Sequence, residues 1–138
     1  MDLASLIIHT DGAARGNPGP AGAGAVIATT DGSVRATVCE YLGETTNNQA
    51  EYRALRFALE KARELGGRKL TIRADSELMI KQIMGEYRVK NPGLREVFDE
   101  IKKLLSFFES WKAEHVRREY NKDADRLANE AIDRHFKK

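Results

Sequence analysis

The spacing of apolar positions changes partway along the chain, and this change separates predicted strands from predicted helices. Up to residue 43, short apolar and β-branched runs alternate with turn residues, which is typical of an antiparallel meander of strands. From residue 46 to residue 65, apolar residues recur at three- and four-residue intervals, the spacing of one helix face. Five strands are predicted, at residues 5–10, 21–30, 33–42, 69–74 and 111–117. Four helices are predicted, at residues 46–65, 76–84, 92–108 and 122–136.

Turn and capping residues mark the ends of these elements. The first strand is expected to stop at Asp11–Gly12, before a turn at residues 16–20, and Asp31–Gly32 predicts a hairpin. Gly66–Gly67 is expected to end the first helix, and Asn121 is expected to cap the last one. The resulting order, β-β-β-α-β-α-α-β-α, predicts an α/β fold with a five-stranded mixed sheet flanked by helices.

The composition narrows the class of protein. A chain of 138 residues, of which 41% are hydrophobic and 32% charged, predicts one globular domain covering residues 1–138. Cys39 is the single cysteine, which excludes an internal disulfide and a multi-cysteine zinc site. No apolar run approaches the roughly 20 residues of a membrane helix, and the N-terminus lacks a signal-peptide pattern, so we expect a cytoplasmic protein without a membrane partner. The net charge of +2 is compatible with nucleic-acid binding but does not argue for it.

Four carboxylates occupy positions where acidic residues are unusual. Glu51 and Asp125 lie on the apolar, core-facing stripes of two predicted helices. Asp11 and Asp75 each follow a predicted strand, at the sheet edge where α/β proteins bind ligands. Clustered carboxylates repel one another and raise each other's pKa unless a divalent cation neutralises them. Since oxygen-only ligands select hard ions, the pattern indicates Mg²⁺ or Mn²⁺ and fits two-metal phosphoryl chemistry.

Each of these carboxylates taken alone has a structural alternative. The two strand-end aspartates could belong to a turn and to a helix cap. Glu51 could form an ion pair with Arg73 or Lys81, and Asp125 could complement the dipole of its helix. These alternatives leave unexplained why four acids fall at element ends and core faces of one small domain.

Four short blocks of the sequence closely resemble the motifs of type 1 ribonuclease H. In chain order they are TDGAARGNPGPAG at residues 10–22, TTNNQAE at 45–51, ADS at 74–76 and NKDADRLA at 121–128. The resemblance covers nearly the whole chain and implies the ribonuclease H-like fold, whose five-stranded mixed sheet agrees with the predicted order of elements. It also implies hydrolysis of the RNA strand of an RNA/DNA hybrid by two-metal-ion catalysis, leaving 5′-phosphate and 3′-hydroxyl ends.

The resemblance further implies a role for individual residues. It places the metal-binding function, for two Mg²⁺ ions with Mn²⁺ as a substitute, on Asp11, Glu51, Asp75 and Asp125. It places contacts with the hybrid duplex on Gly12, Asn17, Thr46, Asn47, Asn48 and Gln49. Short amides donate and accept hydrogen bonds, which suits sugars and groove edges, although capping of the first helix is an alternative for Asn47 and Asn48. Nothing in the sequence requires more than a monomer.

At two places the sequence differs from the family pattern, and there the family's residue roles cannot be assigned to this chain. Many members have a histidine in the loop before the last helix, and residues 116–121 of this chain contain none. His115 falls inside a predicted strand and is interpreted as structural. Arg118 is assigned to the substrate phosphate, with a surface ion pair as the alternative. Residues 87–92 are a brief remnant of the long basic segment that some members carry between their central helices, so a weaker grip on substrate is expected.

Three other functions stay open at this stage. The enzyme could also accept RNA/RNA duplexes, because the loop histidine and the long basic segment are missing. A non-catalytic nucleic-acid-binding module on the same fold is a second possibility, and the presence of all four acids argues against it. A phosphatase acting on small esters is the third, although glycine- and asparagine-rich loops suit an extended duplex better.

Overall fold

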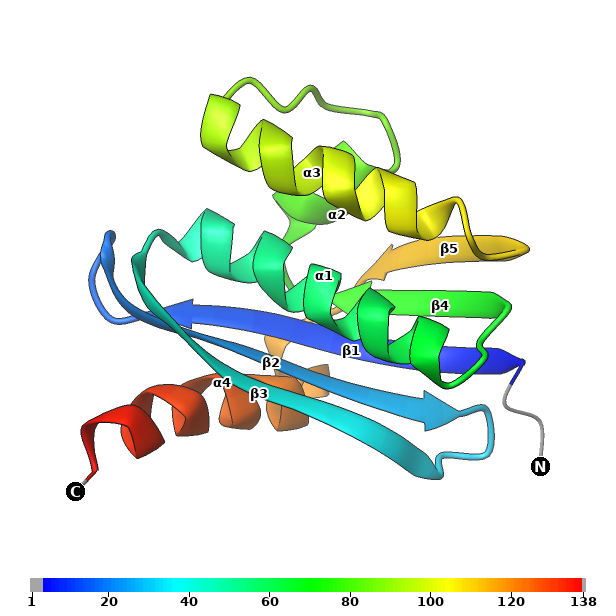
Figure 1. Ribbon diagram of the computed structural model, residues 1–138, viewed down its shortest axis with the longest axis horizontal. Coiled ribbons are helices and arrows are strands. Elements are labelled where there is room, and N and C mark those ends of the chain that lie inside the picture. Colours follow the sequence, from blue (N-terminus) through cyan, green and yellow to red (C-terminus); the bar gives the residue numbers. More distant parts are fainter. Residues whose placement is uncertain (1–3, 138) are drawn as a thin grey trace.

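A five-stranded mixed sheet runs through the middle of the protein (Figure 1). The computed structural model describes residues 4–137. The strands are β1 (Ser5–Ala14), β2 (Gly19–Thr29), β3 (Val34–Thr45), β4 (Lys69–Ala74) and β5 (Ser110–His115). Their spatial order is β3-β2-β1-β4-β5, with β1 to β3 antiparallel and with β4 parallel to both β1 and β5. The predicted α/β class and the mixed sheet are therefore confirmed.

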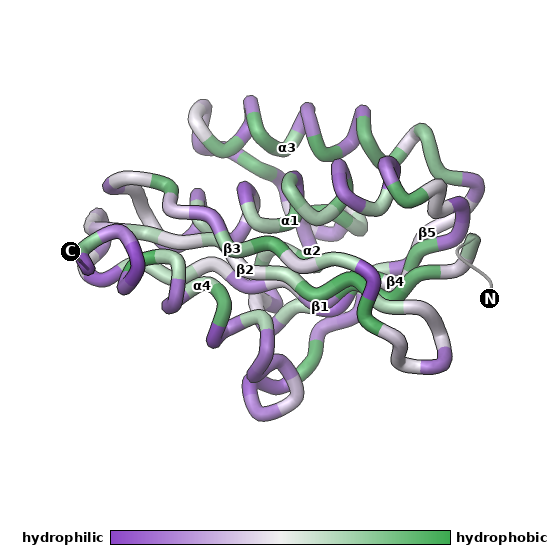
Figure 2. The backbone as a smooth tube through the Cα atoms, turned by 60° about the horizontal axis from the view of Figure 1, so that its bottom comes forward, coloured by the Kyte–Doolittle hydropathy of each residue, from purple (hydrophilic) through white to green (hydrophobic). Residues whose placement is uncertain are grey.

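Helices cover both faces of this sheet. They are α1 (Asn47–Glu64), α2 (Glu77–Ile83), α3 (Pro92–Leu105) and α4 (Lys122–Phe136), with a 3-10 turn at Arg118–Tyr120. Helices α1 and α3 lie on one side of the sheet, and α4 packs alone on the other side, against β1, β2 and β3 (Figures 1 and 2). In Figure 2 the strands between these two helix layers carry much of the hydrophobic sequence. None of the helices within residues 4–137 has the length and apolarity to cross a membrane.

Polar side chains cap the first three helices. Thr46 Oγ1 accepts a hydrogen bond from the Gln49 N–H at 3.2 Å, and Ser76 Oγ accepts one from the Met79 N–H at 3.2 Å. Asn91 caps α3 through its Oδ1, which accepts from two backbone N–H groups of the first turn. Each cap satisfies a donor that has no partner inside the helix, so the helix starts are fixed by short local sequences.

Small residues let α4 lie directly on β2. A Cβ atom added to Gly22 would lie 2.1 Å from the carbonyl oxygen of Ala128. One added to Gly24 would lie 2.2 Å from the carbonyl oxygen of Ala124. Since real Cβ atoms are excluded at such distances, glycine is required at both positions, and α4 approaches the strand backbone closely enough to carry its first turn toward the sheet centre.

The structure corrects two predictions at element ends. The expected stop of the first strand at Asp11–Gly12 is wrong, because β1 continues to Ala14 and Gly12 pairs with Ala23 of β2. Asn121 occupies the N-cap position of α4 as expected, but within residues 4–137 its side chain makes no capping hydrogen bond. Asn121 is almost fully buried, and its Nδ2 donates to the Thr10 carbonyl at 2.8 Å instead of its side chain accepting from α4.

Two further differences concern the C-terminal part. Strand β5 ends at His115, earlier than predicted, and the chain then forms the unpredicted turn at Arg118–Tyr120. Phe136, expected on the core-facing stripe of the last helix, is 58% exposed because the helix end extends beyond the sheet, whereas Ile132 is fully buried.

Candidate metal centre

Three carboxylates from three different elements converge at one edge of the sheet. Asp11 lies on β1, Glu51 lies in the second turn of α1, and Asp75 follows β4 directly. One oxygen of each lies within 4.8 Å of the others. The parallel pairing of β1 with β4 ends at Thr10 opposite Ala74, so the next residue on each of these neighbouring strands is an aspartate.

Glu51 reaches this edge because α1 packs tightly on β1. A Cβ atom on Gly12 would lie 2.2 Å from the carbonyl carbon of Ala50, so the helix can approach only a glycine there. The helix face that carries Glu51 also carries Leu55 and Ala58, which are fully buried as predicted. Glu51 Oε2 is itself buried and has no hydrogen-bond partner among residues 4–137.

Burial makes this group of acids electrostatically unfavourable. It raises the pKa of Asp11, and the neighbouring Glu51 carboxylate raises that pKa further. Burial also raises the pKa of Glu51, with the charge of Asp75 adding to the effect and a hydrogen bond from the Gly12 backbone opposing it. The pKa of Asp75 is raised by burial, although the Arg118 guanidinium acts in the opposite direction. A bound cation would reverse these penalties, because it favours the ionised form of every carboxylate around it.

Arg73 and Lys81 do not provide that compensation for Glu51. Arg73 Nε lies 3.2 Å from an oxygen of Glu114, and Lys81 Nζ lies 3.5 Å from an oxygen of Glu77. Within residues 4–137 no ion pair joins Glu51 to either base. The structural alternative that Glu51 is neutralised by Arg73 or Lys81 is therefore wrong.

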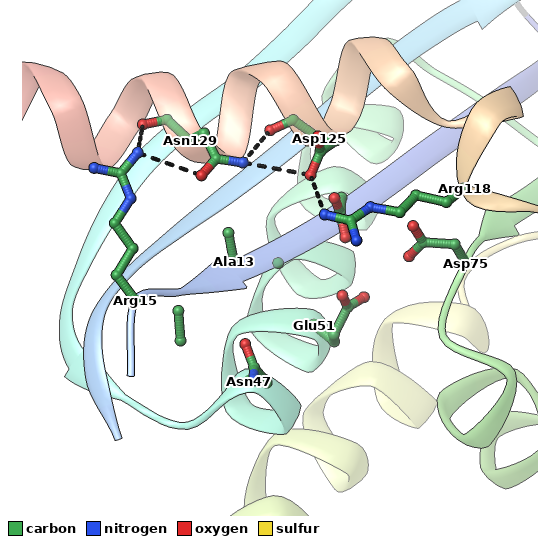
Figure 3. A pocket seen from close by; sticks show the side chains of 11 residues that line it. Ala13, Arg15, Asn47, Glu51, Asp75, Arg118, Asp125 and Asn129 are labelled. Atoms are coloured by element: carbon green, nitrogen blue, oxygen red, sulfur yellow. Dashed lines mark hydrogen bonds and ion pairs between the residues drawn. The ribbon is translucent and has the colours of Figure 1, made fainter. Parts of the chain in front are cut away.

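Asp125 faces the same space from the opposite side of the sheet. It lies in the first turn of α4, where it also complements the helix dipole, and its side chain is 32% exposed. Figure 3 shows Asp125 and Arg118 pointing into the cavity that contains Glu51 and Asp75. The cavity has a volume of about 440 Å³ and is lined by Asp11, Gly12, Ala13, Ala14, Arg15, Asn47, Glu51, Asp75, Arg118, Asp125 and Asn129. The structure thus brings together all four predicted acids, Arg118 and Gly12.

A second groove holds the other predicted contact residues. It has a volume of about 380 Å³ and is lined by Asn17, Thr46, Asn47, Asn48, Gln49, Asn91 and Leu94. Asn47 lines both cavities, so the groove lies next to the acidic site. The Asn47 N–H donates to Asn17 Oδ1 at 3.0 Å, which ties the β1–β2 loop to the start of α1. Because Thr46 caps α1, the capping alternative for Asn47 and Asn48 is wrong, and both side chains are exposed.

Three polar side chains of these cavities, those of Asn91, Asn129 and Arg15, are not among the site residues expected from the sequence. Asn91 precedes Pro92, and an asparagine directly before a helix-starting proline is a common cap, so the local sequence could have identified it. Asn129 stands four residues after Asp125, which places it on the same helix face and could have identified it. Arg15 belongs to the turn motif that follows β1, and nothing local in the sequence indicates its partners on α4.

His115 and Arg118 occupy different environments. His115 closes β5 with its side chain 40% exposed, its Nδ1 lies 3.8 Å from Glu77 Oε2, and it lines neither cavity described above. Arg118 Nη2 lies 3.8 Å from Asp125 Oδ1, and its side chain is 80% exposed. Arg118 is therefore free to move toward a ligand, and its surface ion pair with Asp125 is weak.

Comparisons with known proteins agree with this geometry. A family model described as reverse transcriptase-like matches residues 9–131. Ribonuclease HI of Halobacterium salinarum is 46% identical over 125 residues, which cover 91% of this chain and 63% of that protein. Bifunctional protein Rv2228c of Mycobacterium tuberculosis is 43% identical over 129 residues, which cover 93% of this chain and 35% of that protein. The chain thus spans less than two thirds of the length of these two relatives.

A solved structure of LC11-RNase H1 in complex with an RNA/DNA hybrid superimposes with a TM-score of 0.91 and 44% sequence identity. The match covers 96% of this chain and 99% of that one. The shared sheet and helices, the acid-lined edge and the similarity over most of the sequence point to one conclusion. This chain belongs to the type 1 ribonuclease H family.

Proposed function

We propose that this chain is a metal-dependent endoribonuclease that hydrolyses the RNA strand of RNA/DNA hybrids and leaves 5′-phosphate and 3′-hydroxyl ends. The observation that carries the proposal is the convergence of Asp11, Glu51 and Asp75 within 4.8 Å at the sheet edge. Carboxylates gathered in this way, one of them with a buried oxygen that lacks a hydrogen-bond partner, need a cation to be ionised together.

The donor set fits Mg²⁺, with Mn²⁺ as a substitute. All candidate ligands are carboxylate oxygens, which favour hard divalent ions over zinc or copper. In this proposal Asp11, Glu51, Asp75 and Asp125 together hold two ions. Two bound divalent ions supply activation of water for in-line attack and stabilisation of charge on the departing oxygen.

The residues around the acids suit an extended nucleic acid. Asn47, Asn48 and Gln49 line the groove next to the acidic cavity with their amides, and Asn17 and Thr46 lie beside them. The Gly12 backbone lines the cavity next to the acids, where it can contact a ribose 2′-hydroxyl. This hydroxyl is the group that distinguishes RNA from DNA. Arg118 has five N–H donors and no acceptor, so it can hold a phosphate but cannot remove a proton.

The hybrid as substrate is supported by two independent observations. The groove is lined mainly by hydroxyl and amide groups, which recognise sugars and base edges rather than a compact charged ester. The related LC11 enzyme was solved with an RNA/DNA hybrid bound. Because the complete site is assembled within one chain, we propose that the enzyme acts as a monomer. A cytoplasmic location stays a prediction of the sequence.

A cleavage assay with four substrates tests the proposal. Labelled RNA/DNA, RNA/RNA and DNA/DNA duplexes and a small phosphate ester are each incubated with Mg²⁺, Mn²⁺ or EDTA. We expect cleavage of the RNA strand of the hybrid with either metal and none with EDTA, with 5′-phosphate on the products. Equal cleavage of RNA/RNA and RNA/DNA would indicate a ribonuclease of broader specificity. Hydrolysis of the small ester alone would indicate a phosphatase. Binding of the hybrid without cleavage would indicate a non-catalytic module.

A further inference from the structure

The side chains of Arg15 and Asn129 connect the loop after β1 to α4, immediately beside Asp125 (Figure 3). Arg15 Nη2 donates to Asn129 Oδ1 at 3.3 Å and to the Asn129 carbonyl at 3.4 Å. Arg15 Nη1 forms an ion pair with Asp133 at 2.7 Å. The two segments are 114 residues apart in sequence, so this contact exists only in the folded chain.

Asn129 also holds the Asp125 carboxylate. Its Nδ2 donates to the Asp125 carbonyl at 3.0 Å and to Asp125 Oδ1 at 3.3 Å. Packing alone does not fix this carboxylate, because the Asp125 side chain is 32% exposed. Arg118 also approaches Oδ1, but it is 3.8 Å away and largely exposed, so it is a poor constraint. Asn129 is therefore the better-placed group to set the orientation of Asp125.

Arg15 in turn decides which way the Asn129 amide faces. A guanidinium only donates hydrogen bonds, so it can meet the amide oxygen but not the amide nitrogen. With Oδ1 turned toward Arg15, Nδ2 is turned toward the Asp125 carboxylate. The flipped amide would place an N–H group against the guanidinium and an oxygen against the carboxylate, and both contacts would be repulsive. Asp133 keeps Arg15 in place by occupying its other terminal nitrogen.

We propose that Arg15 and Asn129 are a pair of positioning residues for Asp125, an inference that rests on the nuclease function proposed above. Asn129 holds the carboxylate in the orientation that receives a divalent ion, and Arg15 holds the Asn129 amide. Neither residue needs to touch the substrate for this role. Hydrogen-bonding partners of metal ligands typically change metal affinity or activity by about 10–100-fold when they are removed.

Direct Mn²⁺ binding to the free protein, measured by electron paramagnetic resonance, tests the pair without relying on catalysis. Asn129→Leu keeps the side-chain volume and removes both hydrogen-bonding functions, so we expect it to weaken Mn²⁺ binding by about 10–100-fold. Arg15→Lys keeps a positive charge near Asp133 without the planar fork, so it should lose part of that affinity. Arg126→Ala is the matched control, because Arg126 lies on the same helix with an exposed side chain, and within residues 4–137 it forms an ion pair with half-buried Glu130 alone.

Three further measurements sharpen the test. At saturating Mg²⁺, Asn129→Leu should keep its KM for the hybrid, because the residue does not bind substrate in this proposal. The double variant with Arg15→Ala should bind Mn²⁺ no more weakly than Asn129→Leu alone, because Arg15 acts through Asn129. Metal-free thermal unfolding shows whether each variant is folded, and Asn129→Ala, which adds no apolar bulk, replaces the leucine variant if that one folds poorly.

The outcomes separate this inference from the proposed function. Mn²⁺ affinity in the Asn129 variants equal to that of Arg126→Ala overturns the pair. If Arg15→Ala raises the KM for the hybrid but leaves the Mn²⁺ affinity unchanged, the positioning role is also overturned, because Arg15 would then contact the substrate. If the parent protein binds Mn²⁺ and the Asn129 variants bind it more weakly, but no hybrid is cleaved, then the pair stands and the nuclease function fails.

Discussion

Gly12 packs so closely on Ala50 that a Cβ atom on the glycine would lie 2.2 Å from the alanine carbonyl carbon. Asp11 precedes Gly12 and Glu51 follows Ala50, so this contact between β1 and α1 places the two carboxylates side by side. The packing of the fold thereby imposes the acid cluster, and the raised pKa values of both residues show that the cluster opposes folding when it is ionised without a cation.

Removing one acid should abolish activity without unfolding the protein. We expect Asp11→Asn to lower Mg²⁺-dependent cleavage of the hybrid by more than about 1000-fold, equivalent to about 4 kcal/mol in the barrier. The same variant should be at least as stable as the parent without metal, because asparagine cannot ionise in the buried position beside Glu51. Cleavage rates and urea unfolding in EDTA check both parts, with the exposed Asp99→Asn as control. Full activity of Asp11→Asn would exclude the two-metal proposal.

The metal-free protein should lose stability as the pH rises. Burial raises the pKa of Glu51 to about 7, so the folded protein retains a proton that the unfolded chain releases above about pH 4. The stabilising contribution is therefore complete below about pH 4 and disappears as the pH rises through the folded-state value. Urea unfolding in EDTA between pH 5 and pH 8 should show this decline, and Glu51→Gln, which removes the titrating group, should flatten it. Addition of Mg²⁺ at pH 8 should restore stability, and a pH-independent unfolding free energy would contradict the argument.

Groove residues should affect substrate binding more than the chemical step. Asn47→Ala, Asn48→Ala and Gln49→Ala each remove hydrogen-bonding groups that line the groove, at an expected cost of about 1–3 kcal/mol. We expect this loss as a raised KM with little change in kcat. Steady-state kinetics on the hybrid measures the split, and Thr37→Ala, on an exposed position of β3, serves as control. Normal kinetics in all three variants would remove this groove from the substrate path.

Arg118 should contribute to turnover and His115 should not. Arg118→Ala is expected to lower kcat by about 10–1000-fold, or about 1.4–4 kcal/mol, and Arg118→Lys should recover only part of the loss because it lacks the planar fork. Arg117→Ala is the adjacent control, because Arg117 is equally exposed and pairs with Glu119. His115→Ala removes only a half-exposed contact with Glu77, so its activity should stay near that of the parent. Wild-type turnover in Arg118→Ala, or a folded and inactive His115→Ala, would reverse these roles.

Local sequence was sufficient for the order of elements and for the four acids. Glycine pairs and short capping residues act over a few positions, so the starts of the helices at Thr46, Ser76 and Asn91 follow from adjacent residues. The position of Glu51 on an apolar helix face is equally local, because helical periodicity alone places a carboxylate among core residues.

Only the tertiary structure decided which of these local pieces meet. The central place of β1 depends on pairing with β4, which follows only after α1, and its extension past Asp11 depends on pairing with β2. Asn121 donates to the Thr10 carbonyl, 111 residues away in sequence, and makes no side-chain hydrogen bond to its own helix. The hydrogen bonds from Arg15 to Asn129 and from Asn129 to Asp125 also have no local sequence pattern that predicts them. They form only when α4 packs on the glycines of β2, because this packing brings Arg15 and Asn129 together from distant parts of the chain.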